Sequence, residues 1–392
     1  MRNQVHFEAM RKVLNGVMNA NRYPAARAAA IAVLPHFVRR LSSASGAASV
    51  SPDIDTVESL IDVAFWASLR REEGYMPKIS LVFIDPDRVD NALHLERPIP
   101  LGSQPLTRLA PAVERPGIHL GVWPDEGTLH VWGTIRALPD FCFVLEVIAP
   151  GHLVVKQSRG HDATKFVNVA VLEGEQIKVI DEHAAAEPDC PALLRSLMGL
   201  DAQFSASDSL NVLILLAESM RAHGRGGSLL VVPAAAEMWR DSILHPVTYS
   251  VTPAFSALAD LTQVGEEEKT RLRWRGALRD AIDGVAGLTA VDGATIINDN
   301  YEVLAFGAKI VRRPGCAQVD KVMLTEPIAG SAAVIEEPAL IGGTRHLSAA
   351  QFVHDQRQSI ALVASQDGRF TVFGWSPCED LVHAHRIEAL LL

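Results

Sequence analysis

IGGTRHLSAA, residues 341–350, is the stretch around which the C-terminal half of this chain is organised. Its two adjacent glycines let the backbone approach a ligand closely, and Thr344, Arg345 and His346 follow directly. Ser348 can cap a helix over the next residues, so backbone amide donors would face the same point. Glycines, helix amides and an arginine together suit a polyphosphate. Taken alone, the run is more often a tight turn before a surface helix.

The composition is that of an ordinary globular protein. Hydrophobic residues make up 48% of the 392 residues and charged residues 21%, which leaves room for two or three domains. The formal net charge of -10 argues against a broad grip on a polyanion. We therefore expect no nucleic-acid partner.

Cysteine usage and hydropathy indicate the compartment. The four cysteines are far apart and form no CxxC pair, which argues against a zinc ribbon or a disulfide framework and fits a reducing environment. No segment approaches 18 uninterrupted apolar residues, and the N-terminus lacks a run of signal-peptide type. We expect a cytoplasmic protein without a membrane partner.

Hydrophobic spacing changes along the chain and predicts its organisation. A helical period gives way to a period of two near residue 75, and helices and strands alternate from residue 205. The predicted parts are an N-terminal helical segment (1–75), an antiparallel β-rich meander (76–185), an alternating domain (205–378) and a C-terminal tail (379–392). The fold class is α/β, α+β overall, with a mixed sheet flanked by helices in the C-terminal domain.

Within these parts the pattern predicts individual elements. Helices are expected over 25–40, 57–70, 210–222, 253–260 and 271–283. Strands are expected over 79–84, 229–232, 288–297 and 303–310, with hairpins over 118–133 and 360–375.

Two short motifs accompany the opening stretch. Asp292-Gly293-Ala294 places a carboxylate beside a glycine next to a strand, where the acid can bind a divalent metal or polarise a hydroxyl. Ser365-Gln366-Asp367 places a hydroxyl and a carboxylate at the turn of the last hairpin. Each motif alone is weak, because Asp-Gly pairs are usually turns. Their order and spacing strengthen the interpretation.

These three motifs, in this order, resemble the diadenylate cyclase (DisA_N-type) domain family. That family carries a DGA motif, a GTRHR motif about fifty residues later and an SEE-like motif after a strand. The run from His223 to Pro233 resembles a segment of the family's divergent sensor branch, DACNV, as do Trp132-Gly133 and 150–153. The cyclase-like part covers about residues 205–378.

The resemblance implies an activity: two ATP molecules, held by domains that meet face to face, condense to cyclic di-AMP and pyrophosphate with Mg²⁺ or Mn²⁺. It implies a homo-oligomer. Catalytic roles fall on Asp292, Arg345 and His346, and metal binding on Asp292 and Asp367. Nucleotide binding falls on Gly293, Ala294, Leu304, Gly343, Thr344, Arg345, His346 and Ser365. Phosphoryl transfer depends on positioning and charge neutralisation, which these residue types supply.

Two departures leave a second interpretation open. Leu347 stands where the family has a second arginine, and Gln366-Asp367 replaces a pair of glutamates. A lost charge-assisted phosphate contact costs on the order of 1.5–3 kcal/mol. The chain is therefore predicted to be either a nucleotidyltransferase of the diadenylate cyclase type, the favoured interpretation, or a degenerate nucleotide-sensing module in a signalling or defence system.

Overall fold

The computed structural model describes residues 22–42, 50–158, 166–181 and 212–392, apart from residue 270. The chain divides into two compact units, residues 1–180 with Leu392 and residues 181–391. We refer to them as the N-terminal and the C-terminal unit. Residues 1–21 of the predicted N-terminal helical segment, and the stretch between the predicted domains that end at 185 and begin at 205, lie outside the described residues.

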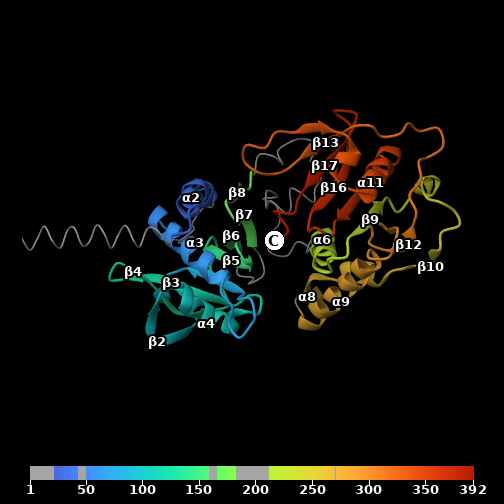
Figure 1. Ribbon diagram of the computed structural model, residues 1–392. Coiled ribbons are helices and arrows are strands. Elements are labelled where there is room, and N and C mark those ends of the chain that lie inside the picture. Colours follow the sequence, from blue (N-terminus) through green and yellow to red (C-terminus); the bar gives the residue numbers. More distant parts are fainter. Residues whose placement is uncertain (1–21, 43–49, 159–165, 182–211, 270) are drawn as a thin grey trace, which may run out of the picture. The chain divides into compact units, whose positions relative to one another are not determined.

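The N-terminal unit, drawn in blue to green in Figure 1, is built on a sheet. This sheet has eight strands in the order β2-β4-β3-β1-β5-β6-β7-β8. Its strands are β1 (Ile79–Phe83), β2 (Leu93–Pro100), β3 (His119–Asp125), β4 (Thr128–Ile135), β5 (Phe143–Ala149), β6 (His152–Ser158), β7 (Phe166–Glu173) and β8 (Gln176–Val179). Its described helices are α2 (Ala26–Ser42), α3 (Ile54–Ser68), α4 (Ser103–Val113) and the short 3₁₀ helix η1 (Pro86–Arg88).

One face of this sheet forms the main core with the helices. Phe37 of α2 and Ile61 of α3 are fully buried in one cluster with Leu81 of β1 and Leu145 of β5. The alternate residues of the same strands point to the other face, where Val82 and neighbouring strand residues pack beneath Trp132. The sheet therefore buries apolar side chains on both faces.

The purely antiparallel meander predicted for this region is wrong in one respect. Strands β1 and β3 are parallel, with Leu81 opposite Leu120, while the other pairs of this sheet are antiparallel. A parallel pair needs a crossover, and α4 lies within it. The sequence hides α4 because Pro105 and Pro111 interrupt its helical pattern.

The C-terminal unit is built on a nine-stranded mixed sheet with the order β10-β12-β11-β9-β15-β16-β17-β13-β14. Its strands are β9 (Gly227–Val232), β10 (Tyr249–Phe255), β11 (Ala294–Asn298), β12 (Val303–Ala308), β13 (Val322–Thr325), β14 (Val334–Glu336), β15 (Ile360–Ala364), β16 (Phe370–Ser376) and β17 (Leu381–Arg386). Its described helices are α6 (Val212–Ala222), η3 (Met238–Ser242), α7 (Ala257–Thr262), α8 (Glu266–Lys269), α9 (Leu272–Leu288), α10 (Pro338–Ile341) and α11 (Thr344–Asp355).

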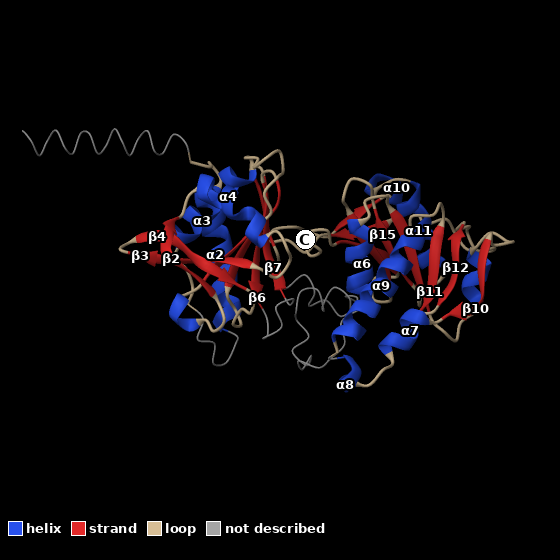
Figure 2. Ribbon diagram, turned by 90° about the horizontal axis from the view of Figure 1, so that it is seen from below, coloured by secondary structure: helices blue, strands red, loops and turns tan. Residues whose placement is uncertain are grey.

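Helix α11 packs against this sheet, and so does the pair of helices α6 and α9 (Figure 2). Helix α11 lies along β15, β16 and β17, and its Phe352 is fully buried in one cluster with Leu230, Ala361 and Phe373. Helices α6 and α9 pack against each other, and α6 also contacts β15. The predicted fold class, α/β in this domain and α+β overall, is confirmed.

Several element predictions can be compared with this unit. Helix α6, strand β12 and the hairpin of β15 and β16 occur where the patterns indicate. The strand predicted over 288–297 is wrong at its start, because α9 extends to Leu288 and β11 begins only at Ala294. The helix predicted over 253–260 is wrong at its start, because β10 extends to Phe255 and α7 begins only at Ala257. The stretch described as a C-terminal tail contains β17, an inner strand whose buried His383 and His385 interrupt the apolar pattern.

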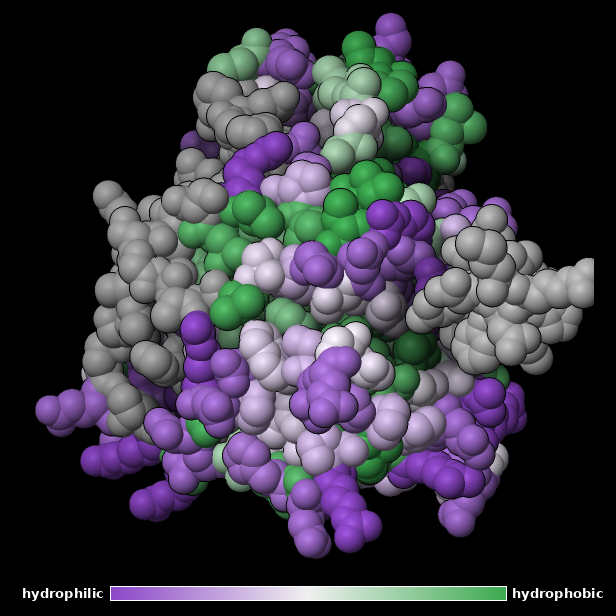
Figure 3. Space-filling model, turned by 90° about the vertical axis from the view of Figure 1, so that its left-hand side faces the viewer, coloured by the Kyte–Doolittle hydropathy of each residue, from purple (hydrophilic) through white to green (hydrophobic). Residues whose placement is uncertain are grey.

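Surface hydropathy completes the description. In the part of the chain that the structure describes, no helix combines the length and the apolar character needed to cross a bilayer. On the face drawn in Figure 3, groups of hydrophobic side chains lie between hydrophilic ones. Scattered apolar exposure of this kind is normal for a folded surface.

Because His385 is buried, we expect the stability of the C-terminal unit to depend on pH. Its Nδ1 lies 2.6 Å from Thr325 Oγ1, and burial lowers its pKa to about 3. The imidazole therefore stays neutral in the folded protein, whereas the unfolded chain takes up a proton near pH 6.5. As the pH falls from 6.5 toward 3, this residue should lower the free energy of unfolding of the C-terminal unit by at most about 1.4 kcal/mol per pH unit. Urea unfolding at several pH values should show a shallower dependence for His385→Asn, and equal slopes would contradict the prediction.

Candidate functional site

The pairing register brings four chain segments to one end of the C-terminal sheet. Gly227, which begins β9, pairs with Ala364, which ends β15. Ala294, which begins β11, pairs with Ser228 on one side and with Ala308, near the end of β12, on the other. We call this end of the sheet, with the loops at 223–227, 291–293 and 365–369, the motif end. The Asp292 and Ser365 motifs both lie there.

Helix α11 brings the third motif to the same end. His346 in its first turn is buried, with Nε2 3.4 Å from Thr371 Oγ1 at the start of β16. Gly343 occupies the N-cap, and its carbonyl oxygen accepts a 3.0 Å hydrogen bond from the His346 amide. The predicted cap at Ser348 is therefore wrong. Helix α10 ends at Ile341, and the two glycines separate it from α11. Thr344 and Arg345 are therefore the first two residues of α11.

Arg345 lies between two loops of the motif end. Its Nη1 is 3.1 Å from the position that a Cβ on Gly226 would occupy, and Gly226 has a φ of +71°. Gln366 Nε2 donates a 3.3 Å hydrogen bond to the carbonyl oxygen of Arg225, which joins the loop before β9 to the last hairpin. The exposed guanidinium thus stands beside a glycine-rich loop, an arrangement that suits an anion.

Asp292 and Gly293 form the next part of the site. Gly293 has a φ of +120°, and a Cβ there would lie 2.4 Å from the carbonyl carbon of Gly307. This close approach fixes the loop that presents Asp292. The exposed Asp292 carboxylate accepts a 2.6 Å hydrogen bond from Lys309 Nζ, and Lys309, followed by Arg345, keeps the pKa of Asp292 below its usual value.

Asp367 is held by the turn in which it lies. A hydrogen bond from the Ser365 side chain is the main reason that the pKa of Asp367 lies below its usual value. Arg369 adds an ion pair, with Nε 3.4 Å from Asp367 Oδ2. Ser365 and Asp367 therefore interact with each other.

The pKa of His346 reflects the burial and the charges around this side chain. Its pKa is lowered, first by burial and then by the positive charge of Arg386, with smaller effects from Arg369 and Arg345; Asp367 acts in the opposite direction. The positive charges of Arg386, Arg369 and Arg345 thus all act on His346. This environment favours a bound anion.

The three remaining predicted site residues are Thr344, Ala294 and Leu304. Thr344, the first residue of α11, is exposed at the motif end. Ala294 is buried and contributes backbone rather than side chain to the surface. Leu304 lies farther along β12 and packs against the core. Leu347, which stands where the resembled family has a second arginine, is half-buried against the same core.

Sequence reasoning missed three basic residues of this site, Lys309, Arg369 and Arg386. Lys309 directly follows β12, Arg369 directly precedes β16 and Arg386 ends β17, and a single basic residue at such a place has no distinctive signature. The pairing of β12 and β17 with their neighbours shows that Lys309 and Arg386 belong to the site, because both strands end where the motifs lie.

The predicted metal ligands can be tested against these contacts. Asp292 is held by Lys309 and Asp367 by Arg369, at the distances given above. Among the residues that the structure describes, no three histidine, cysteine or acidic side chains gather as a metal-binding group. Divalent magnesium and manganese prefer several oxygen ligands, so this set of donors does not fit a dedicated metal centre.

Substitution of Gly342 tests how tightly His346 is packed in the site. A Cβ on Gly342 would lie 2.3 Å from Nδ1 of the buried His346, so Gly342→Ala must displace the imidazole. We expect a loss of about 1–3 kcal/mol in the free energy of unfolding. Urea denaturation measures it. Gly343→Ala is the matched control, because nothing lies within 4 Å of its Cβ position, and equal effects of the two would contradict the argument.

Comparison with known proteins gives one informative match. Residues 31–136, within the N-terminal unit, match a family model described as "Probable sensor domain DACNV". No curated protein matches the chain. A crystal structure described as a hypothetical membrane spanning protein from Bacillus cereus is 13% identical, covers 49% of this chain and 70% of its own, and has a TM-score of 0.27. That score is too low to carry an argument. The N-terminal unit is thus similar to a probable sensor domain over residues 31–136.

Proposed function

We propose that the protein is a nucleotide sensor whose C-terminal unit binds a phosphate-bearing nucleotide at the motif end. The observation that carries the proposal is the convergence of Asp292-Gly293, the first turn of α11 and Ser365-Asp367 at one end of one sheet. The match of residues 31–136 to a probable sensor domain supports the sensing role.

The chemistry of the motif end supports an anionic ligand. The first turn of α11 presents backbone amide groups and the positive end of its dipole, and Arg345 lies in that turn. Gly226 and Gly343 carry no side chain, so a ligand can approach the backbone closely at both positions. A Cβ on Gly226 would also crowd Arg345. Phosphate groups satisfy donors of this kind, and a guanidinium can bind them through two hydrogen bonds.

A second candidate function is the cyclase reaction, in which two ATP molecules condense to cyclic di-AMP in a face-to-face homo-oligomer. The order of the three motifs favours it. In that reaction Asp292 would act on the 3′-hydroxyl, and Mg²⁺ or Mn²⁺ would supply charge neutralisation at the phosphates. Leu347 weighs against it, because its side chain packs on the core and leaves α11 without the second cation.

Binding and turnover assays test both candidates. Calorimetry with ATP and with cyclic dinucleotides should give binding, and chromatography after incubation with ATP and Mn²⁺ should give no dinucleotide. Formation of cyclic di-AMP by the wild type, abolished in Asp292→Asn, would establish the cyclase instead. If none of the nucleotides binds, both candidates fail.

A further inference from the structure

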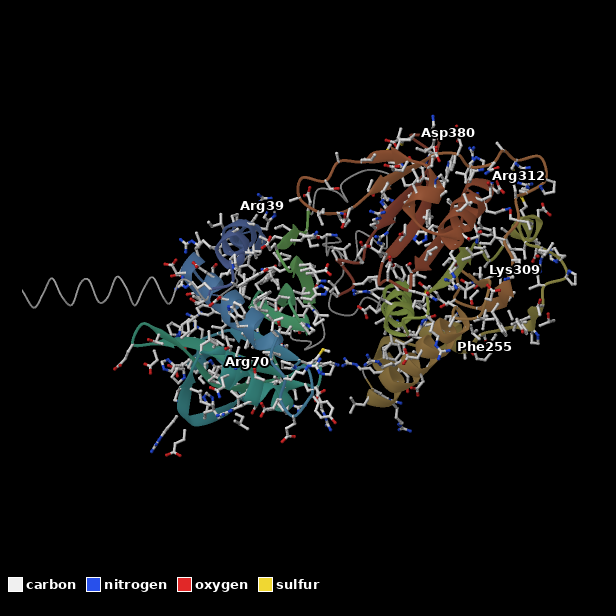
Figure 4. The ribbon with its side chains drawn as sticks, viewed as in Figure 1. Arg39, Arg70, Phe255, Lys309, Arg312 and Asp380 are labelled. Atoms are coloured by element: carbon white, nitrogen blue, oxygen red, sulfur yellow. The ribbon has the colours of Figure 1, made fainter. Side chains whose placement is uncertain are left out.

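Lys309 holds the carboxylate on which a metal would depend. It directly follows β12, whose Ala308 pairs with Ala294, so the strand register places Lys309 beside the loop of Asp292. Its Nζ lies 2.6 Å from Asp292 Oδ2. Its own carbonyl oxygen accepts a 2.8 Å hydrogen bond from the Leu244 amide, which fixes the backbone from which the side chain extends. Figure 4 labels this side chain.

The pair between Lys309 and Asp292 contributes little to folding stability. Both side chains are largely exposed, at 51% for Lys309 and 90% for Asp292, and exposed ion pairs contribute little to stability because water screens them. A contribution to folding stability therefore does not explain the ion pair between Lys309 and Asp292. Its importance lies in the charge that it places at the motif end.

The other carboxylates at this end also have basic neighbours. Asp367 pairs with Arg369, and Glu388, near the start of β16, interacts with Arg221. Arg345 and Arg386 add further positive charge around His346. A divalent cation at Asp292 would have to displace an ammonium group and would stand within the field of Arg345.

An ammonium group can serve a phosphate directly. Lysine carries three donors on a flexible stem, so Lys309 can keep one hydrogen bond to Asp292 and offer the others to a ligand. Asp292 would then orient the ammonium group toward the phosphates.

We propose that Lys309 takes the place of the divalent metal at Asp292, so that this unit holds the phosphates of its nucleotide with side-chain cations alone. The inference rests on the proposed function and sharpens it. The ligand is a nucleotide bound as the free anion, and Lys309 is the residue that determines this preference.

The experiment compares ATP binding with and without metal. Purified full-length protein is titrated with ATP by calorimetry, once in EDTA and once in Mg²⁺. The wild type should bind with dissociation constants that agree within about threefold. Lys309→Met, which keeps the length of the stem and removes the charge, should weaken binding in EDTA by about 10- to 150-fold. Mg²⁺ should restore part of this loss, because Asp292 is then open to a metal.

Two further variants sharpen the result. Lys309→Arg keeps the positive charge and should retain metal-independent binding. Lys321→Met removes an exposed lysine from a loop of the same unit and should bind like the wild type. Circular dichroism checks that each variant is folded.

Two results would overturn the inference and leave the proposed function intact. One is a wild-type affinity that falls more than tenfold in EDTA, and the other is unchanged metal-free binding by Lys309→Met. If the wild type binds no nucleotide in either buffer, the proposed function fails and this inference fails with it.

Discussion

Replacing Arg345 with alanine should weaken nucleotide binding about 10- to 150-fold. A charge-assisted hydrogen bond contributes about 1.5–3 kcal/mol, and tenfold in affinity corresponds to about 1.4 kcal/mol. Arg345 is exposed in the first turn of α11, beside Gly226, so its removal takes a cation from the proposed phosphate site without opening the core. Calorimetric titration of the variant with ATP measures the loss.

The controls separate charge from shape. Arg345→Lys keeps the charge but loses the planar pair of donors, so an intermediate affinity is expected. Arg279→Ala removes an exposed arginine from α9 and should leave binding unchanged. The thermal unfolding of Arg345→Ala should match that of the wild type. Undiminished ATP binding by Arg345→Ala would refute the location of the site.

Gly293→Ala should cause the largest loss of stability, about 3 kcal/mol or more. A φ of +120° strains any L-residue with a side chain, and the new Cβ would lie 2.4 Å from backbone atoms of Gly307, which cannot move aside alone. Strands β11 and β12 would have to separate at the point where Ala294 faces Ala308. Urea denaturation followed by tryptophan fluorescence measures the effect.

Gly284→Ala is the matched control for this glycine. Gly284 lies inside α9, and a Cβ there meets nothing within 4 Å. The same chemical change should therefore raise the free energy of unfolding by about 0.5–1 kcal/mol. Hydrogen exchange provides a second measurement: Gly293→Ala should lose protection first in β11 and β12. A loss below 1 kcal/mol for Gly293→Ala would contradict the close packing of the two glycines.

The fold was predictable from the sequence where local signals agree with the tertiary arrangement. The hairpin of β15 and β16 has an apolar-rich run on either side of the turn at Asp367-Gly368, and α6 has a clear helical period. Prediction failed where a long-range contact decides. The parallel pairing of β1 and β3 depends on α4, and β10 extends to Phe255 because it pairs with β12.

The candidate site was predictable only as a set of motifs. The order of Asp292, Arg345 and Ser365 indicated that they belong together, and the sheet register places their segments at one end. The neighbours that set the charge were not predictable. Lys309 and Arg386 are single basic residues, and only strand pairing brings them near Asp292 and His346.

Strand β10 has a consequence for how copies of this protein meet. It is an edge strand, its register with β12 is interrupted between Ser250 and Phe255, and Pro253 gives it one backbone position without an N–H group. Such an edge is a poor template for adding a strand from another molecule, which protects this edge of the nine-stranded sheet from edge-to-edge aggregation. Any association on this side must use side chains such as the exposed Tyr249 and Phe255 rather than a continued hydrogen-bonded ladder.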